Sequence, residues 1–285
     1  MKTVTPEWTT DLPVLLDVAQ TAPKSARLPR LRLWHGVALF GAALLFSSIA
    51  GAQTGAGEAS PIAVIIKWMP LLLSGFLFNL LLSALSMALG TVLGVPLGLL
   101  QLSELRALRA CAWAFTQFFR NAPWLVLLFF AMYLVPYQFR FGEMTIPFPD
   151  WIKAVIGFAL PVMANVAEIV RGAVQSLPGG QWEAAESLAF TRRQTMWMII
   201  LPQCLQRMLP PWMNVYSLIT MSTVLASIVG INEMLTLTAQ VHNAEGGRPD
   251  LLAPLYGFAL LCFFIYCYPI NLWTVRLERR FHVKN

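Results

Sequence analysis

Long segments without charged residues are the feature that most limits how this chain can fold. Apolar runs of about 20 residues or more recur along its 285 residues, and a helix of about 20 residues crosses the ~30 Å hydrocarbon core of a bilayer. Only 12% of the residues are charged and 57% are hydrophobic, whereas roughly a quarter of a soluble domain is charged. The chain is therefore predicted to be an all-α integral membrane protein.

Six segments are predicted to cross the membrane, and they define the domains. They are residues 33–52, 69–100, 113–135, 152–174, 213–231 and 251–275. Residues 1–32 are predicted to form a loosely ordered tail, because they carry four prolines. The 33–52 segment has a rival interpretation as a secretory signal peptide, since residues 50–52 read Ala-Gly-Ala, a small-x-small cleavage pattern. The length of the tail ahead of it favours a retained, extra transmembrane helix.

The distribution of lysine and arginine predicts the orientation of the chain. With the N-terminus in the cytoplasm, fifteen of these residues lie in inner segments, four lie in outer segments, and Arg120 lies near an interface. Basic residues concentrate on the cytoplasmic side of membrane proteins. Both termini and the polar loop at residues 175–209 are therefore predicted to be cytoplasmic, and the segments 53–68, 136–151 and 232–250 are predicted to be outer loops.

Several functional classes lack support in the sequence. The net charge of +6 comes from short basic loops between apolar runs, which is typical of membrane orientation and does not favour nucleic-acid binding. The four cysteines have no metal-ligand spacing, so neither a disulfide nor a metal is predicted. The chain has no Gly-x-x-x-x-Gly-Lys-[Ser/Thr] loop to hold ATP phosphates. No catalytic residue and no cofactor of its own are expected.

The polar loop in the second half is predicted to form a small helix-turn-helix on the membrane surface. A short helix is expected from Gln181 to about Leu188, with Glu183 in its first turn, where the helix dipole favours a negative charge. Thr191 and Gln194 fit a capping box that starts a second helix. Pro202 is predicted to break that second helix.

This loop resembles the EAA loop of the permease subunits of bacterial ABC importers. The resemblance rests on Glu183-Ala184-Ala185 and on the spacing to Ile199 and Leu201-Pro202. The chain departs from the family at Ala189, where the family has glycine. If that position needs a left-handed backbone, alanine costs about 1 kcal/mol there relative to glycine. The resemblance assigns coupling to an ATPase to Glu183, Ala184, Ala185, Leu188, Ala189, Ile199, Leu201 and Pro202.

Further stretches resemble the polar amino-acid uptake branch, the histidine, glutamine and glutamate type. They are Phe119 to Trp124, similar to the branch's Arg-Gly-Thr-Pro-Leu motif, and Glu168 to Ala173, which follows its Glu-x-x-Arg-Gly-Ala pattern. In Met221 to Gly230, Met221 and Ser222 replace a charged pair of the branch. Residues assigned from these stretches to the translocation pathway or the permease interface are Arg120, Asn165, Glu168, Arg171, Thr223 and Ser227.

Plainer roles remain open for these residues. Glu168 and Arg171 are spaced to pair along one helix, and Arg120 suits an anchor that reaches the membrane interface. Asparagines within the spans are more often interhelical hydrogen-bonding groups than ligands of a solute.

The resemblance covers about residues 68–280 and implies a five-helix type I ABC importer permease core, to which the 33–52 helix is added. It further implies a location in the inner membrane and an assembly that imports an amino acid. The expected partners are a second permease subunit, identical or different, a pair of ATPase subunits that bind ATP and Mg, and a periplasmic amino-acid-binding protein. The alternatives are a self-contained secondary transporter or channel, or a membrane enzyme.

Overall fold

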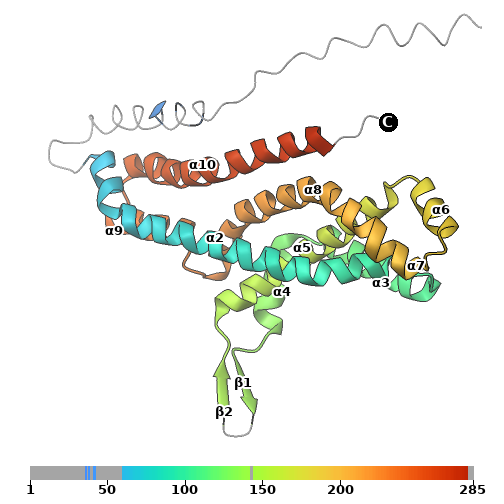
Figure 1. Cartoon of the computed structure of the whole chain (residues 1–285). Coiled ribbons are helices and arrows are strands. Elements are labelled where there is room, and N and C mark those ends of the chain that lie inside the picture. Colours follow the sequence, from blue (N-terminus) through green and yellow to red (C-terminus); the bar gives the residue numbers. More distant parts are fainter. Residues whose placement is uncertain (1–35, 37, 39–40, 43–59, 142–143, 282–285) are drawn as a thin grey trace, which may run out of the picture.

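The computed structural model describes residues 36, 38, 41–42, 60–141 and 144–281. Within them, four helical segments are long and apolar enough to span a membrane. They are α2 (Pro61–Leu100), α5 (Asp150–Gln175), a continuous helical run over Arg192–Val229, and α10 (Pro249–Phe281). Figure 1 shows α2, α8 (Leu201–Ser222) and α10 running alongside one another. The membrane architecture expected from the apolar runs is confirmed for this part of the chain.

The span predicted at residues 113–135 is two helices. α3 (Arg106–Asn121) and α4 (Trp124–Leu134) are separated at Pro123. Ala122 has extended backbone angles, φ −73° and ψ 138°, as expected for a residue that precedes proline. The prediction of one continuous helix was wrong because it followed hydrophobicity and gave no weight to this proline.

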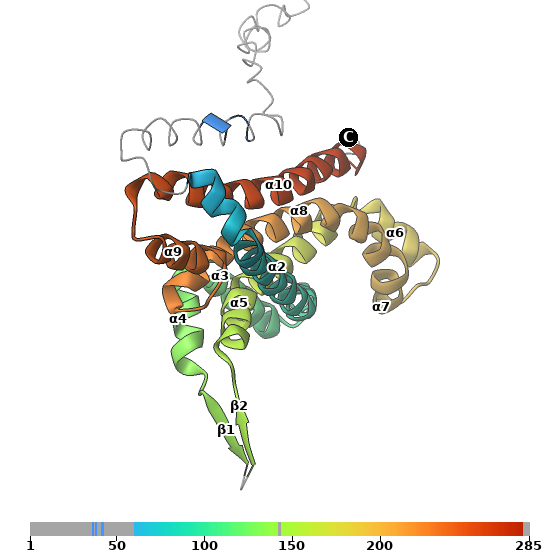
Figure 2. The ribbon, with the colours of Figure 1, turned by 90° about the vertical axis from the view of Figure 1, so that its left-hand side faces the viewer.

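All three predicted outer loops contain regular structure. The first, residues 53–68, includes the start of α2 at Pro61, ahead of the span predicted to begin at residue 69. Strands β1 (Gln138–Phe141) and β2 (Met144–Pro147) form an antiparallel hairpin that projects beyond α4 (Figures 1 and 2). The segment 232–250 contains the helix α9 (Met234–Ala244), capped by Glu233, whose side chain accepts a hydrogen bond from the Thr236 amide. The prediction missed α9 because its many polar residues resemble loop composition.

Helix α5 lies at the centre of the bundle. In its most apolar stretch 67% of the residues are buried, against 28% to 33% in the corresponding stretches of the other spans. α2 approaches it along three glycines spaced four residues apart: a side chain at Gly94 would lie 2.6 Å from the Met163 carbonyl oxygen, and one at Gly98 would lie 2.6 Å from that of Ala167. Small residues at this spacing let membrane helices pack backbone to backbone.

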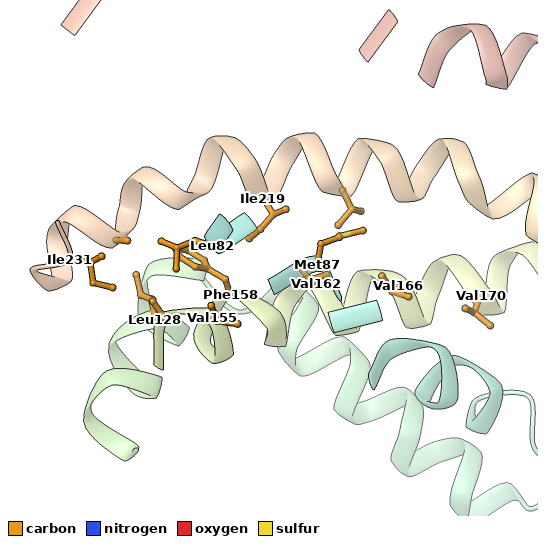
Figure 3. Close-up of a cluster of buried hydrophobic side chains, with 13 residues drawn as sticks. Leu82, Met87, Leu128, Val155, Phe158, Val162, Val166, Val170, Ile219 and Ile231 are labelled. Carbon is orange, nitrogen blue, oxygen red and sulfur yellow. The ribbon is translucent and has the colours of Figure 1, made fainter. Parts of the chain in front are cut away.

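The apolar core is assembled around α5 from four other elements. Figure 3 shows Phe158, Val162 and Val166 of α5 packed near Leu82 and Met87 of α2, with Leu128, Ile219 and Ile231 contributed from other elements. The remaining surfaces of α2, α8 and α10 carry many exposed large apolar side chains. In water such surfaces would be costly, so they fit a lipid or subunit environment.

The proposed N-terminal regions lie largely outside the described residues. The tail 1–32 is entirely outside them, and of the 33–52 segment only residues 36, 38, 41 and 42 are described, all of them helical. A side chain added at Gly36 would overlap the ring of Phe264 in α10. The segment therefore passes very close to α10 at this point.

Candidate functional site

The loop between α5 and α8 is built around a short helix, α6 (Gly180–Ser187). This helix confirms the prediction, and Glu183 lies in its first turn with its side chain exposed. Ala185 is 1% exposed, whereas Leu188 is 72% exposed. Ala185 therefore faces the protein, while Glu183, Ala184 and Leu188 present the outer surface of the helix.

Ala189 adopts the left-handed conformation that its position demands. Its φ is +59°, and it is the one non-glycine residue with positive φ in the described part of the chain. The Phe190 amide donates to the Ala185 carbonyl at 3.1 Å, and the Ala189 amide donates to the Glu186 carbonyl at 2.9 Å. This pair of bonds is the Schellman pattern that ends a helix. The loop thus has the turn expected with glycine, built with an alanine.

The second half of the loop starts as predicted. Thr191 and Gln194 form a capping box, in which the Gln194 amide donates to the Thr191 hydroxyl and the Thr191 amide donates to the Gln194 side-chain oxygen. α7 (Arg192–Gln194) follows and leads into a π-helical turn, η1 (Thr195–Ile200).

Pro202 does not end this helix, so that prediction was wrong. α8 begins at Leu201 and continues through Pro202. Proline lacks an amide hydrogen and clashes with the carbonyl four residues earlier in a regular α-helix. The wider π turn immediately before it changes the hydrogen-bond register and lets the helix continue.

A compact apolar cluster anchors the loop to the membrane helices. Ile200 and Cys204 are fully buried against Ala173, Val174 and Leu177 at the end of α5, with Trp182 and Ile199 packed around them. Arg207 also donates to the Ser176 carbonyl at 2.8 Å. Packed side chains therefore connect α6 to α5 and α8.

Charged residues on α3 and α5 meet in a polar stripe. Glu168 forms ion pairs with Arg171 on its own helix and with Arg120 of α3, the latter at 3.6 Å. Arg171 also donates to the Gln175 side-chain oxygen at 2.6 Å. Asn165 lies one turn before Glu168, and its amide donates to the Pro161 carbonyl of its own helix. The polar stripe is Asn165, Glu168, Arg171 and Gln175 of α5 together with Arg120 of α3.

All members of the polar stripe retain some exposure, although α5 is otherwise the most buried span. Ionisable groups inside membrane proteins face the bundle interior, a subunit or an aqueous cavity. The stripe therefore marks a face of this subunit that is not directed at the hydrocarbon core of the bilayer.

Thr223 and Ser227 lie apart from the stripe, in the 3₁₀ segment η2 (Thr223–Val229). Thr223 is fully buried, and its hydroxyl accepts a hydrogen bond from Asn79 of α2 at 3.0 Å. Asn79 also donates to the Glu233 carboxylate at 2.9 Å and accepts from the Met234 amide. This network joins α2, η2 and α9, so Asn79 has the interhelical bonding role expected for such asparagines.

Sequence reasoning missed two buried charged residues. Glu233 is fully buried at the start of α9, and Lys153 is fully buried with its ammonium group 3.2 Å from the centroid of the Tyr137 ring. Both were assigned to or next to outer loops, where charge is expected to be exposed. The cue available in the sequence for Glu233 was its position three residues before Thr236, where its side chain can cap the N-terminus of a helix.

Residues 90–283 match the family described as the binding-protein-dependent transport system inner membrane component. Over 216 residues the chain is 35% identical to the probable amino-acid ABC transporter permease protein YckA of Bacillus subtilis, covering 76% of this chain and 91% of the relative. It is 32% identical to the L-cystine transport system permease protein TcyB of the same organism, covering 75% and 88%.

Two solved structures share the fold. One, from an amino acid ABC transporter crystallised with histidines, has a TM-score of 0.65 and 24% identity, and covers 76% of this chain and 96% of that chain. The other, from the MetNI methionine ABC transporter in an inward-facing conformation, has a TM-score of 0.58 and 19% identity, with coverage of 76% and 99%.

Proposed function

The chain belongs to the family of binding-protein-dependent transport system inner membrane components, and from this premise we propose that it is the transmembrane permease subunit of an ATP-driven amino-acid importer. Relatives named as amino-acid, cystine, glutamine and glutamate permeases support the substrate class. The chain itself is a transporter component, and ATP with Mg acts on a separate ATPase subunit.

The observation that carries the proposal is the loop at Gly180–Leu201, which presents exposed side chains and is held by hydrogen bonds and apolar packing. Its short helix ends in the Schellman turn, which leads directly into the capping box of α7, and Trp182 of the helix packs against the apolar cluster around Ile200. Exposed Glu183 and Leu188 offer a charged and an apolar contact on the same small helix. Such an element suits transmission of a rigid-body movement from an ATPase to α5 and α8.

The coupling residues have two kinds of role in this proposal. Glu183, Ala184, Leu188 and Pro202 are exposed and would meet the ATPase. Ala185, Ala189 and Ile199, with Leu201, would hold the shape of the loop, since Ala185 is buried, Ala189 makes the turn and the two apolar residues pack beside Ile200.

The polar stripe is proposed to line the translocation pathway or the interface with a second permease subunit. Arg120, Asn165, Glu168 and Arg171 form a polar face on an otherwise apolar subunit, and a like surface or an aqueous path would stabilise it. Thr223 and Ser227 are proposed to contribute indirectly, through the η2 segment that the buried Asn79 network holds in place.

The orientation follows from the basic residues. The inner side is proposed to carry both termini and α6, and the outer side the hairpin and α9, where a periplasmic amino-acid-binding protein would dock. The segment 33–52 is proposed to be a retained helix beside α10, supported by the close approach of Gly36 to Phe264. Residues 68–280 would form the permease core.

Site-directed cross-linking tests the docking of the loop. Cysteine placed at Leu188 in membranes that contain the ATPase subunit is expected to cross-link to it, and Glu183→Lys is expected to reduce that product strongly. Cysteine at Ile62, which is similarly exposed at the opposite end of α2, is the matched control and should give no product. Equal cross-linking from both positions, or none from Leu188, would contradict the proposal.

A further inference from the structure

A hollow of about 370 Å³ lies beside the first turns of α3, at the end of the molecule that carries α6. It is lined by the α3 residues Arg106, Arg109 and Trp113, by Gln101 after α2, and by Arg171 and Gln175 at the end of α5. The three α3 residues are spaced by three and four positions, so they share one face of the helix. Arg171 and Gln175 are also the last two members of the polar stripe along α5, so the hollow adjoins the end of that stripe. It has no role in the proposed docking of the coupling loop.

The hollow carries positive charge that the described residues leave unbalanced. Neither Arg106 nor Arg109 forms an ion pair with any carboxylate among residues 60–141 and 144–281; Arg109 reaches only the Ser103 carbonyl, at 3.5 Å. Both arginines lie in the first turn of a helix, which has no acidic residue and no side-chain cap. Positive side chains at this end of a helix oppose its dipole, so a bound anion would relieve both effects.

Gln101 supplies an independent sign of a missing partner. It is 3% exposed, and its side-chain amide donates to the Thr116 hydroxyl at 2.9 Å. Its side-chain oxygen is buried and accepts no hydrogen bond from the described residues. A buried acceptor without a donor costs about 1–3 kcal/mol. A ligand that fits this site should therefore bring a hydrogen-bond donor as well as an anionic group.

Several apolar side chains beside the hollow are exposed. Trp113, Leu105 and Leu108 of the same helix region are all exposed, and tryptophan gathers at the membrane interface. A ligand whose headgroup enters the hollow would therefore lay its chains on these side chains.

We propose that this hollow is a binding site for the headgroup of an anionic phospholipid of the inner leaflet, with the chemistry of phosphatidylglycerol. Arg106 and Arg109 would bind the phosphate, a headgroup hydroxyl would donate to the Gln101 side-chain oxygen, and the acyl chains would lie along Trp113 and Leu108. Basic pockets between membrane helices on the cytoplasmic side bind lipid headgroups. The inference relies on the proposed orientation and reaches beyond the proposed transport role.

Native mass spectrometry of the full chain in detergent, titrated with phosphatidylglycerol or phosphatidylcholine, tests the proposal. Wild-type protein is expected to retain phosphatidylglycerol in preference to phosphatidylcholine. Arg106→Gln and Arg109→Gln should each raise the lipid concentration for half-saturation about fivefold. Arg279→Gln removes another exposed positive charge, at the inner end of α10, and should change nothing.

Two further arms separate the lipid from other sources of the same chemistry. Wild-type protein should also prefer phosphatidylglycerol to phosphatidic acid, which lacks the glycerol headgroup and its hydroxyls. Gln101→Leu should abolish that preference while the effects of the arginines persist. Soluble glycerol phosphate should not displace the lipid. Equal losses for Arg106→Gln and Arg279→Gln would overturn a built site, and full displacement by glycerol phosphate would assign the hollow to a soluble anion.

Discussion

Replacing Ala189 with glycine tests whether the coupling loop has the strained turn described above. A left-handed backbone costs an alanine about 1–2 kcal/mol. Glycine avoids this strain but loses about 0.5–1 kcal/mol of the gain, because it has more conformational freedom in the unfolded chain. With φ at +59°, Ala189→Gly should therefore stabilise the closed turn by about 1 kcal/mol. The amide of Phe190, bonded across this turn to Ala185, is the reporter.

Hydrogen exchange of the full chain in nanodiscs measures this difference directly. A stabilisation of about 1 kcal/mol corresponds to roughly fivefold slower exchange of the Phe190 amide. Ala184→Gly is the matched control, because Ala184 is exposed and lies inside α6. Glycine in a helix interior costs about 1 kcal/mol, so exchange should become roughly fivefold faster.

The two substitutions make the same chemical change and should move exchange in opposite directions. Faster exchange in Ala189→Gly, or equal shifts in both variants, would refute the assignment of a left-handed turn at this residue.

Three other predictions follow from the packing and the ion pairs. Gly94→Ala would place a methyl group 2.6 Å from a carbonyl oxygen of α5 and should destabilise the chain by about 1–3 kcal/mol in thermal unfolding. The control Ala88→Leu, on the exposed face of α2, should change stability by less than ~0.5 kcal/mol. Equal effects of the two substitutions would contradict the close packing of α2 on α5. Glu168→Gln leaves two arginines without their shared carboxylate and should reduce uptake at least about tenfold at unchanged protein level. Uptake at the wild-type rate would show that Glu168 has no role in the pathway. The hydrogen bond from Lys67 lowers the pKa of Glu245 from its ordinary value of 4.5, so the ion pair stabilises the fold above that pH and stops doing so as pH falls through the lower pKa of the folded state. Between pH 5 and pH 3 the melting temperature of the wild type should therefore fall further than that of Glu245→Gln. Parallel decreases in the two proteins would contradict the ion pair.

The long apolar spans were predictable because hydrophobic length is a direct requirement of the bilayer. Much of the loop was predictable, since the dipole preference of Glu183 and the capping box at Thr191 are local effects, whereas the left-handed turn at Ala189 was expected from the glycine that the family has there. Local rules failed where two effects competed. At Pro123 the break in the helix outweighed the apolar run, and at Pro202 a π turn prevented the break.

The burial of Glu233 and the meeting of Arg120 with Glu168 depend on tertiary contacts between segments far apart in sequence. Residue spacing predicts only pairs within one helix, such as Glu168 with Arg171. The hollow beside α3 is of the same kind, because Gln101, Arg106 and Arg171 come together only after α5 packs against α3. Charge marked Arg120, Glu168 and Arg171 in the sequence, but their partners, and the importance of Gln101 and Glu233, came from the fold.

The most direct test of the central claim is uptake of radiolabelled amino acids by liposomes that contain this chain, with and without the ATPase subunit and ATP. The account predicts uptake only when the external binding protein, the ATPase subunit and ATP on its side of the membrane are all present. It also predicts that Glu183→Lys abolishes uptake while the protein stays in the membrane. Uptake by this chain alone, without ATP, would contradict the account and indicate a self-contained transporter.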